Sequence, residues 1–270
     1  EDPYIYLMYT YTSAAGEQYN RVSRFKDQNN QAGEEEIILD QIPAGNYHDG
    51  GRIAFGPDGM LYITTGDTFN REIAQAMDNL GGKILRLTPA GNIPEDNPFP
   101  DAPIYSLGHR NPQGLAWHPD TGELFISDHG PSGEGGLRQK DRIKVVEAGS
   151  NFGWPNKIGY FEDGEYANPL IMWENAVPPS GMAFYQGDLY VGTLRSRSLV
   201  RIGLSRENNT FKVNKIEHLF NDGRGNSGYG RIRTAVAGPD GYLYFLTNNR
   251  DGRGRPREND DQILRFKIEE

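Results

Sequence analysis

The sequence contains no cysteine, so disulfide bonds cannot stabilise its fold and no metal site can use a thiolate ligand. It also lacks an apolar run of about 18 residues, the length that a membrane-spanning helix needs. Positive charge is scarce as well, since 28 lysines and arginines stand against 37 acidic residues and give a net charge of −9. That balance argues against a general nucleic-acid binder, and it leaves room for a local basic pocket.

Glycine and proline, by contrast, are abundant. The 270 residues include 34 Gly and 17 Pro, and 36% of them are hydrophobic. A chain of this length and composition buries a substantial core. So many turn-forming residues are typical of an all-β fold.

One stretch, residues 47–67, combines a β-hairpin with a histidine and an aspartate. Apolar and β-branched runs at 53–55 and 61–65 flank a Gly-Pro-Asp-Gly turn. Because a tight turn brings the outer ends of two strands together, we expect His48 and Asp67 to lie close to each other. This is one way to build a histidine base with an orienting carboxylate, and equally a buried histidine satisfied by a local acid.

The hairpin pattern recurs three more times, and a further strand-like run follows every copy. The later copies lie at residues 115–128, 181–193 and 234–247, and the runs that follow the four hairpins lie at 83–87, 142–146, 199–202 and 262–267. Units of about four strands, repeated roughly every 40–60 residues, indicate a β-propeller.

Strand-like runs also precede the first hairpin, at residues 4–11, 20–26 and 35–40. We interpret the first two as the last strands of a blade. The prediction is therefore one β-propeller domain over residues 1–270, with about four full blades and a leading half-blade, incomplete at its N-terminus. A complete five-bladed propeller with a degenerate first blade is the alternative. Because an open half-blade exposes strand edges, its missing strands are expected to come from a longer chain or from elsewhere.

Two polar motifs flank the second hairpin. Arg110 and Asn111 belong to a dense polar run, Gly-His-Arg-Asn-Pro-Gln-Gly, just before its first strand. Gly130 and Pro131 follow its second strand, and backbone carbonyls there suit a hard cation, which takes oxygen ligands. The first motif is either a binding segment or a hydrogen-bonded turn, and the second is either a cation site or a plain turn.

Cationic pairs accompany the third and fourth hairpins. Arg195 and Arg197 follow the second strand of the third, whereas Arg231 and Arg233 begin the fourth unit. Alternate positions of a strand face the same side, so each pair suits bidentate binding of carboxylates. The alternative is a solvated strand face on which the arginines pair with acidic side chains.

Taken in order, these motifs resemble those of the soluble PQQ-dependent aldose sugar dehydrogenases, the glucose/sorbosone dehydrogenase family. The ordered set comprises His48-Asp-Gly-Gly-Arg, Gly108-His-Arg-Asn-Pro-Gln-Gly, Asp128-His-Gly-Pro, Asn151-Phe-Gly-Trp-Pro, Pro179-Ser-Gly-Met and Tyr229-Gly-Arg-Ile-Arg. The resemblance covers nearly the whole chain. It implies a six-bladed β-propeller whose first blade and half of whose second blade have no counterpart here.

The resemblance implies catalytic roles for His48, Asp67 and Arg110, and cofactor binding for Arg110 and Asn111. His48 corresponds to the general base and Asp67 to its orienting partner. Arg110 and Asn111 correspond to residues at the sugar and cofactor site.

It also implies a site for calcium and PQQ. The carbonyls of Gly130 and Pro131 correspond to ligands of the calcium that holds the cofactor. Arg195 replaces a family lysine beside the quinone, and Arg231 and Arg233 correspond to clamps on the PQQ carboxylates.

The chain departs from the family pattern at Asp141-Arg142, where Asp-Glu often binds a second, structural calcium. This departure puts the second calcium site in question.

The function implied by the resemblance is oxidation of aldose sugars to lactones with hydride transfer to PQQ. An aldose and an external electron acceptor are the implied partners, and a periplasmic or secreted location is implied with them. Two alternatives remain open. A metal-dependent lactonase-type hydrolase needs several converging Asp, Glu and Asn side chains, and we find no such set. A non-catalytic carbohydrate-binding propeller has little need for the His48–Asp67 pair and the arginine pairs together.

Overall fold

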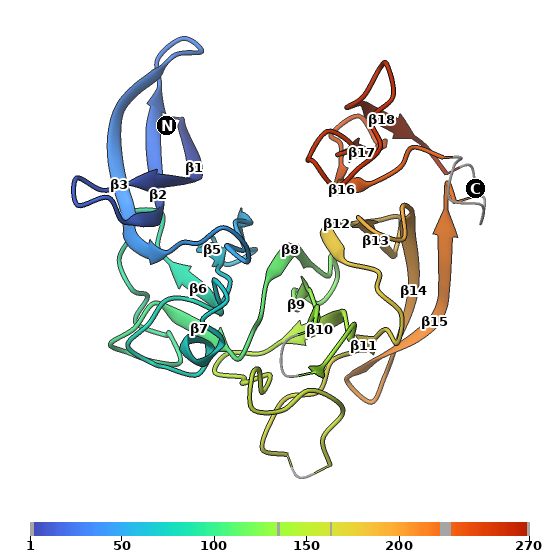
Figure 1. Ribbon diagram of the computed structural model, residues 1–270, viewed down its shortest axis with the longest axis horizontal. Helices are drawn as coiled ribbons and strands as arrows, with labels where there is room; N and C mark the ends of the chain where they lie inside the picture. Colours follow the sequence, from blue (N-terminus) through green and yellow to red (C-terminus); the bar gives the residue numbers. More distant parts are fainter. Residues whose placement is uncertain (1–2, 134–135, 163, 222–227, 269–270) are drawn as a thin grey trace. The chain divides into compact units, whose positions relative to one another are not determined.

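The computed structural model describes residues 3–133, 136–162, 164–221 and 228–268. Within these ranges the named elements are eighteen strands and one short 3₁₀ helix, and the strands form five antiparallel sheets (Figure 1). The all-β class predicted from the turn-rich sequence is therefore confirmed. The chain divides into two compact units, Glu1–Pro112 with Glu147–Ala167 and Gln113–Val146 with Asn168–Glu270.

The first unit holds two sheets. The sheet β1-β2-β3 consists of β1 (Tyr4–Thr12), β2 (Gln18–Asp27) and β3 (Ala32–Pro43). The sheet β4-β5-β6-β7 consists of β4 (Ile53–Phe55), β5 (Leu61–Thr64), β6 (Lys83–Leu87) and β7 (Ile104–Leu107). The 3₁₀ helix η1 (Arg71–Ala74) lies in the connection between β5 and β6.

Apolar side chains of these two sheets form one core. Successive residues of a strand face opposite sides, so alternate residues supply the packed face. Fully buried members of the core include Val22, Ile42, Ile63, Leu85 and Ile104. The two sheets of the first unit are therefore held together by their facing apolar surfaces, as successive blades of a propeller are.

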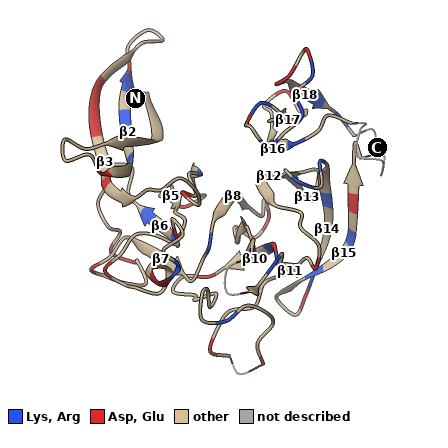
Figure 2. Ribbon diagram, viewed as in Figure 1, with Lys and Arg blue, Asp and Glu red and all other residues tan. Residues whose placement is uncertain are grey.

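Charged residues also link strands of the first sheet. Ion pairs join β2 to β3 between Arg21 and Asp40 at 2.7 Å and between Arg24 and Glu36 at 2.6 Å. Figure 2 shows Lys and Arg segments in blue on β2 and Asp and Glu segments in red on β3. Because both pairs are partly exposed, each contributes about 1 kcal/mol or less to stability. The core, and not these pairs, holds the sheet in place.

The second unit contains three sheets, the first of which starts at the unit boundary. The sheet β8-β9-β10-β11 consists of β8 (Pro112–Trp117), β9 (Leu124–Asp128), β10 (Arg142–Val146) and β11 (Ile171–Met172). The sheet β12-β13-β14-β15 consists of β12 (Pro179–Tyr185), β13 (Asp188–Thr193), β14 (Leu199–Glu207) and β15 (Thr210–Leu219). The sheet β16-β17-β18 consists of β16 (Ile232–Ala237), β17 (Leu243–Thr247) and β18 (Ile263–Phe266).

Two apolar clusters join these three sheets. The cluster between the first two sheets includes Phe125, Ile143, Met182, Val191 and Ile202. The cluster between the last two includes Tyr190, Leu199, Ile232, Leu243 and Phe245. Each sheet in this unit thus buries a face against the next one in the chain.

The four hairpins predicted from the sequence are present as β4–β5, β8–β9, β12–β13 and β16–β17. The strand predicted after each hairpin is also present, as β6, β10, β14 and β18. Three sheets have the four strands of a full blade. The sheet predicted as a leading half-blade has three strands, and the last sheet has three described strands. The number of blades and the single-domain organisation stay predictions. No helix in the described part of the chain has the length and hydrophobicity needed to span a membrane.

Candidate functional site

The β4–β5 hairpin brings His48 and Asp67 together. Backbone hydrogen bonds continue beyond the strand ends, from Gly51 N to Thr64 O at 3.0 Å and from Thr68 N to His48 O at 3.2 Å. The distance between His48 Nδ1 and Asp67 Oδ1 is 2.7 Å. The proximity expected from the hairpin is therefore observed, and we refer to these two residues as the His48–Asp67 pair.

Three donors hold the Asp67 carboxylate in one orientation. The residue is only 1% exposed. Its Oδ1 accepts hydrogen bonds from His48 and from Phe69 N, and its Oδ2 accepts one from Trp154 Nε1 at 2.8 Å. An ionised carboxylate only accepts, so this contact assigns the proton to Nδ1 of His48. Its Nε2 then keeps a lone pair, and no other described residue is hydrogen-bonded to it.

The backbone around the pair is strained and closely packed. His48, Thr68 and Phe69 have φ angles of 63°, 48° and 67°, which non-glycine residues rarely adopt. A Cβ atom on Gly66 would lie 1.7 Å from the His48 carbonyl oxygen, so only glycine fits there. The Phe69 ring stacks on the imidazole with 4.2 Å between ring centroids. Backbone strain of this kind clusters at functional sites.

Trp154 had no predicted role in the sequence. It lies in the Asn-Phe-Gly-Trp-Pro motif that supported the family resemblance, but 87 residues separate it from Asp67. Gln75 holds the segment in place, because its Nε2 donates to Trp154 O at 2.7 Å and to Asn151 Oδ1 at 3.0 Å. The aromatic motif was the available signal, and its contact with the carboxylate emerges only from the fold.

Arg110 and Asn111 lie beside the His48–Asp67 pair. Both are buried, with 1% and 4% exposure. The Arg110 carbonyl accepts a hydrogen bond from Asp67 N at 2.8 Å, and its guanidinium carbon lies 5.8 Å from the Trp154 ring centroid. Asn111 Oδ1 accepts a hydrogen bond from Gly50 N at 3.1 Å. The polar run therefore packs against the pair, while its role in sugar and cofactor binding stays a prediction.

Gly130 and Pro131 form a tight loop in the second unit. Gly130 N donates to Asp141 Oδ1 at 2.9 Å, and a Cβ atom on Gly130 would lie 1.8 Å from Gln139 O. Pro131 O accepts a hydrogen bond from Gln139 N at 2.8 Å. Among the described residues, none donates a hydrogen bond to the Gly130 carbonyl. That carbonyl keeps both lone pairs and the Pro131 carbonyl keeps one, so both suit a cation that takes oxygen ligands.

Arg142, the residue that departs from the family pattern, belongs to a buried ion cluster. Its guanidinium donates to Asp128 Oδ2 at 3.2 Å, and the same oxygen accepts a hydrogen bond from Lys144 Nζ at 2.6 Å. Burial lowers the pKa of Lys144, while the charge of Asp128 opposes that shift. Arg142 therefore partners Asp128 at the position where the family often has an acidic calcium ligand.

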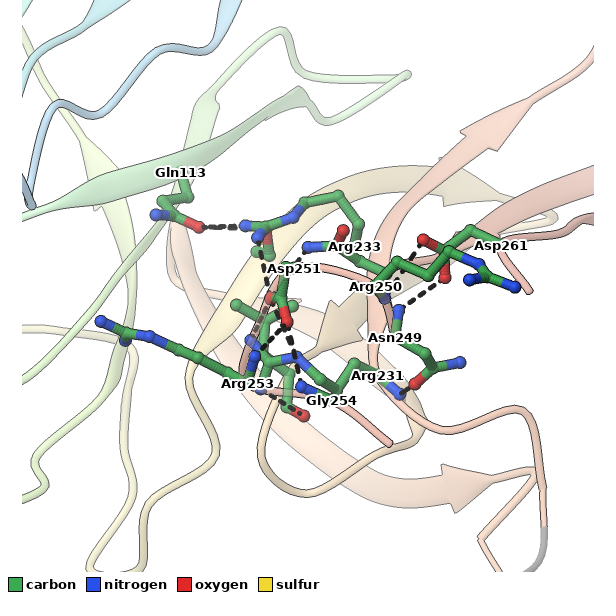
Figure 3. Close-up of polar contacts among 12 residues, drawn as sticks. Gln113, Arg231, Arg233, Asn249, Arg250, Asp251, Arg253, Gly254 and Asp261 are labelled. Carbon is green, nitrogen blue, oxygen red and sulfur yellow. Dashed lines mark hydrogen bonds and ion pairs between the residues drawn. The ribbon is translucent and has the colours of Figure 1, made fainter. Parts of the chain in front are cut away.

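Arg231 and Arg233 converge on one carboxylate, that of Asp251 (Figure 3). Arg231 donates through Nε and Nη2 to Asp251 Oδ2 at 3.0 and 2.7 Å, and through Nη1 to Leu194 O at 3.3 Å. Arg233 Nη2 lies 3.9 Å from the same oxygen, and its Nη1 donates to Gln113 Oε1 at 2.9 Å. The alternate spacing thus places both arginines at one point.

Asp251 is a site residue that was not predicted from the sequence. Its Oδ1 accepts hydrogen bonds from the backbone N–H groups of Arg253 and Gly254 at 2.9 and 3.1 Å (Figure 3). Burial alone would raise the pKa of Asp251, but these N–H groups and the Arg231 guanidinium hold it below its ordinary value. The Asp-Gly turn after β17 was visible in the sequence, but its pairing with the arginines was not.

Arg195 differs from Arg231 and Arg233. It is exposed and forms no hydrogen bond or ion pair with the described part of the chain. Within that part, no three His, Asp or Glu side chains gather as a metal site. The candidate calcium ligands are thus backbone carbonyls.

Comparison with known proteins shows the family of the chain. The family model for glucose/sorbosone dehydrogenase matches residues 1–255. The aldose sugar dehydrogenase YliI of Escherichia coli (strain K12) is 35% identical over 240 residues, which cover 79% of this chain and 60% of that protein. This chain thus spans less than two thirds of the length of that relative.

Two solved structures are similar throughout. A Thermus thermophilus structure that bears the name glucose dehydrogenase has a TM-score of 0.90 and 48% identity, covering 97% of this chain and 78% of its own. The PQQ-bound form of an aldose sugar dehydrogenase from Streptomyces coelicolor has a TM-score of 0.85 and 36% identity, covering 98% and 75%. The chain belongs to the glucose/sorbosone dehydrogenase family, and it has the β-propeller fold class of that family.

Proposed function

We propose that this protein oxidises aldose sugars at the anomeric carbon to lactones, with PQQ as its cofactor and calcium as its metal. The observation that carries the proposal is the His48 imidazole, whose Nδ1 is bound by Asp67 and whose Nε2 keeps a lone pair. The names of the relatives, an aldose sugar dehydrogenase and a PQQ-bound form of another, support it.

His48 is the general base of the proposed reaction. Its Nε2 takes the proton of the anomeric hydroxyl, and the Asp67 carboxylate stabilises the imidazolium that results. Trp154 and Phe69 keep the carboxylate aimed at Nδ1. Base catalysis of this type typically supplies about 10²–10⁴-fold in rate.

The residues of the second unit fit a polycarboxylate such as PQQ. Arg231 has five N–H groups, and three of them donate to described residues, so two have no acceptor in the described part of the chain and suit a ligand. Arg233 is partly exposed and lies beside it, and Arg195 adds a third cation. PQQ, when bound, supplies the acceptor for the hydride that leaves the anomeric carbon.

Gly130 and Pro131 fit the proposed calcium. Their loop is fixed by Asp141 and Gln139, and toward the described residues both carbonyls keep lone pairs for a cation. Calcium there would supply Lewis acidity toward a carbonyl oxygen. Arg110 and Asn111 complete the proposal as residues that contact sugar and cofactor, and an external electron acceptor is the remaining partner. We place the protein in the periplasm or outside the cell, in line with the family.

The test is steady-state oxidation of aldoses by this chain with saturating PQQ and calcium. Reduction of a dye reports the rate. We expect His48→Ala to lose most turnover and to keep its affinity for PQQ, because the lost group handles the substrate proton. Asp67→Asn should cost less, since it weakens the base without deleting it. Turnover should also fall on acidification, because a protonated imidazole cannot accept a proton.

Three outcomes would contradict the proposal. Near wild-type turnover in His48→Ala would assign the base to another group. No dye reduction by the wild-type chain, with hydrolysis of lactones in its place, would favour the hydrolase. Sugar binding without any turnover would favour the carbohydrate-binding propeller.

A further inference from the structure

Lys83 is a buried lysine that the proposed reaction does not use. It is the first residue of β6, and it is 0% exposed. Its Nζ donates to three backbone carbonyls, those of Ile73 at 2.7 Å, Ala74 at 3.2 Å and Gly81 at 2.8 Å. An ammonium group has three donors, and a buried charge is costly unless it is fully satisfied. These carbonyls therefore form a cage that fits a small cation.

The carbonyls of this cage belong to the segment that follows Asp67. Ile73 and Ala74 lie in η1, and Gly81 lies just before Lys83 itself. Their carbonyl groups face one point only because the chain folds back on itself here. Ala74 O also accepts a hydrogen bond from Gly108 N at 3.1 Å, which ties η1 to the polar run that carries Arg110.

Hydrogen bonds connect the segment that forms the cage to the His48–Asp67 pair, both before and after η1. Before η1, Asn70 N donates to Asp67 O at 2.7 Å. After η1, Gln75 binds Trp154 O, and the Trp154 indole donates to Asp67 Oδ2. The orientation of the carboxylate thus depends on a segment whose carbonyls converge on a single ammonium group.

Burial lowers the pKa of Lys83 to about 7, and the charge of Asp78 opposes the shift. The three carbonyl acceptors also favour the charged form, because a neutral amine has only two N–H groups to offer them.

We propose that Lys83 is a positioning residue for the His48–Asp67 pair, acting as an internal cation that fixes η1 and, through Gln75 and Trp154, aims the Asp67 carboxylate at His48. This inference deepens the proposed function and rests on it for the role of His48. The inference requires a cation with N–H groups inside the carbonyl cage. This cation, Lys83, follows η1 in the chain, whereas Asp67 precedes η1. The apolar stem of the lysine is not enough.

The experiment uses the cofactor-free chain at a pH below the Lys83 pKa of about 7, so that the lysine is charged and the result does not depend on turnover. In ¹⁵N-histidine-labelled protein, the Nδ1–H proton of His48 is assigned by its loss in His48→Ala. We expect Lys83→Met, which keeps an apolar stem, to shift or broaden this signal. Lys83→Ala leaves room for a small amine, so added ethylammonium should restore the signal and tetramethylammonium, which has no N–H group, should not. Lys144→Met, a change at a buried lysine of the second unit, should leave the signal unchanged.

Turnover with PQQ and calcium gives a second readout. In Lys83→Ala we expect kcat to fall about 10- to 100-fold with little change in KM, because misplacement of a catalytic group by about 1 Å costs on this order. Ethylammonium should recover part of kcat. A folded Lys83→Met with an unchanged His48 signal would overturn the inference. Equal recovery of Lys83→Ala with ethylammonium and with tetramethylammonium would overturn it as well. If His48→Ala kept its turnover, the proposed function would fail, while the proton signal would still decide the role of Lys83.

Discussion

Asp67 and Asp251 are both carboxylates that fix a nitrogen group, and they do so in different surroundings. Asp67 is 1% exposed and divides its two oxygens among an imidazole, an indole and a backbone N–H. The Asp251 side chain is 16% exposed and places two Arg231 nitrogens on a single oxygen. The first arrangement orients an imidazole, whereas the second leaves Arg231 with N–H groups that no described residue accepts.

One residue-scale prediction concerns Arg231. In Arg231→Ala we expect the affinity for PQQ to fall by about 1.5–3 kcal/mol, because a charge-assisted contact to a carboxylate is lost. Equilibrium titration of PQQ followed by absorbance measures it. Arg206→Ala is the control, since Arg206 is paired with Glu123 at 2.6 Å elsewhere in the same unit.

Removal of Arg231 also leaves Asp251 without its main partner, which would itself repel an anion. The double variant Arg231→Ala/Asp251→Asn separates the two effects, because it removes both charges. If Arg231→Ala bound PQQ as tightly as the wild type, the carboxylates would have to be assigned to another part of the chain.

At the scale of elements, the Gly130–Pro131 loop depends on close backbone approach. In Gly130→Ala the new Cβ would lie 1.8 Å from Gln139 O, so the loop must shift. We expect a loss of about 1–3 kcal/mol in the free energy of unfolding, the usual cost of overpacking. Urea unfolding measures it.

Gly203→Ala in β14 is the matched control for this change. Its nearest neighbour would be the Lys215 Cβ at 3.4 Å, an ordinary contact. Alanine in a strand also loses less entropy on folding than glycine does. Equal unfolding midpoints for the two variants would mean that the loop at Gly130 yields easily.

The sequence predicts these elements where their signals are local. The four hairpins and the strand after each of them follow from alternation and turn residues within about 20 residues of chain. The strand β7 was not predicted, and β11 has only two residues, too few for a periodic pattern. The strand β15 was not predicted either, although it pairs with β14 along nearly its whole length.

The same limit applies to the site. The approach of His48 to Asp67 was predictable because a single hairpin creates it. Trp154 and Asp251 were not, because their partners are 87 and 20 residues away and no turn rule connects them. The carbonyl cage of Lys83 had no sequence signal either, since backbone direction cannot be read from residue types.

At the scale of the whole molecule, stability should depend on pH through Lys83. Its pKa of about 7 lies below the ordinary value of 10.5, so the unfolded chain binds the proton more readily than the folded one. The cost of burying the charged lysine is fully present below about pH 7, so the free energy of unfolding is lowest there. It should rise as pH increases toward 10. Between about pH 6 and pH 9 we expect a gain on the order of 2 kcal/mol.

Chemical unfolding at several pH values, compared between the wild type and Lys83→Met, checks this prediction. The variant has no amine at this position, so the difference between the two proteins should change with pH in that range. A constant difference would show that the carbonyl cage and Asp78 keep the lysine charged throughout.

The indole that binds Asp67 also gives the molecule an optical reporter. Trp154 is 1% exposed, and its N–H points at a carboxylate, so its fluorescence should be sensitive to the charge on Asp67. The chain has three tryptophans, and subtraction of the Trp154→Phe spectrum would isolate this one. Emission from the natural protein, without any added label, would then follow the state of the proposed base while sugar, PQQ or calcium is titrated.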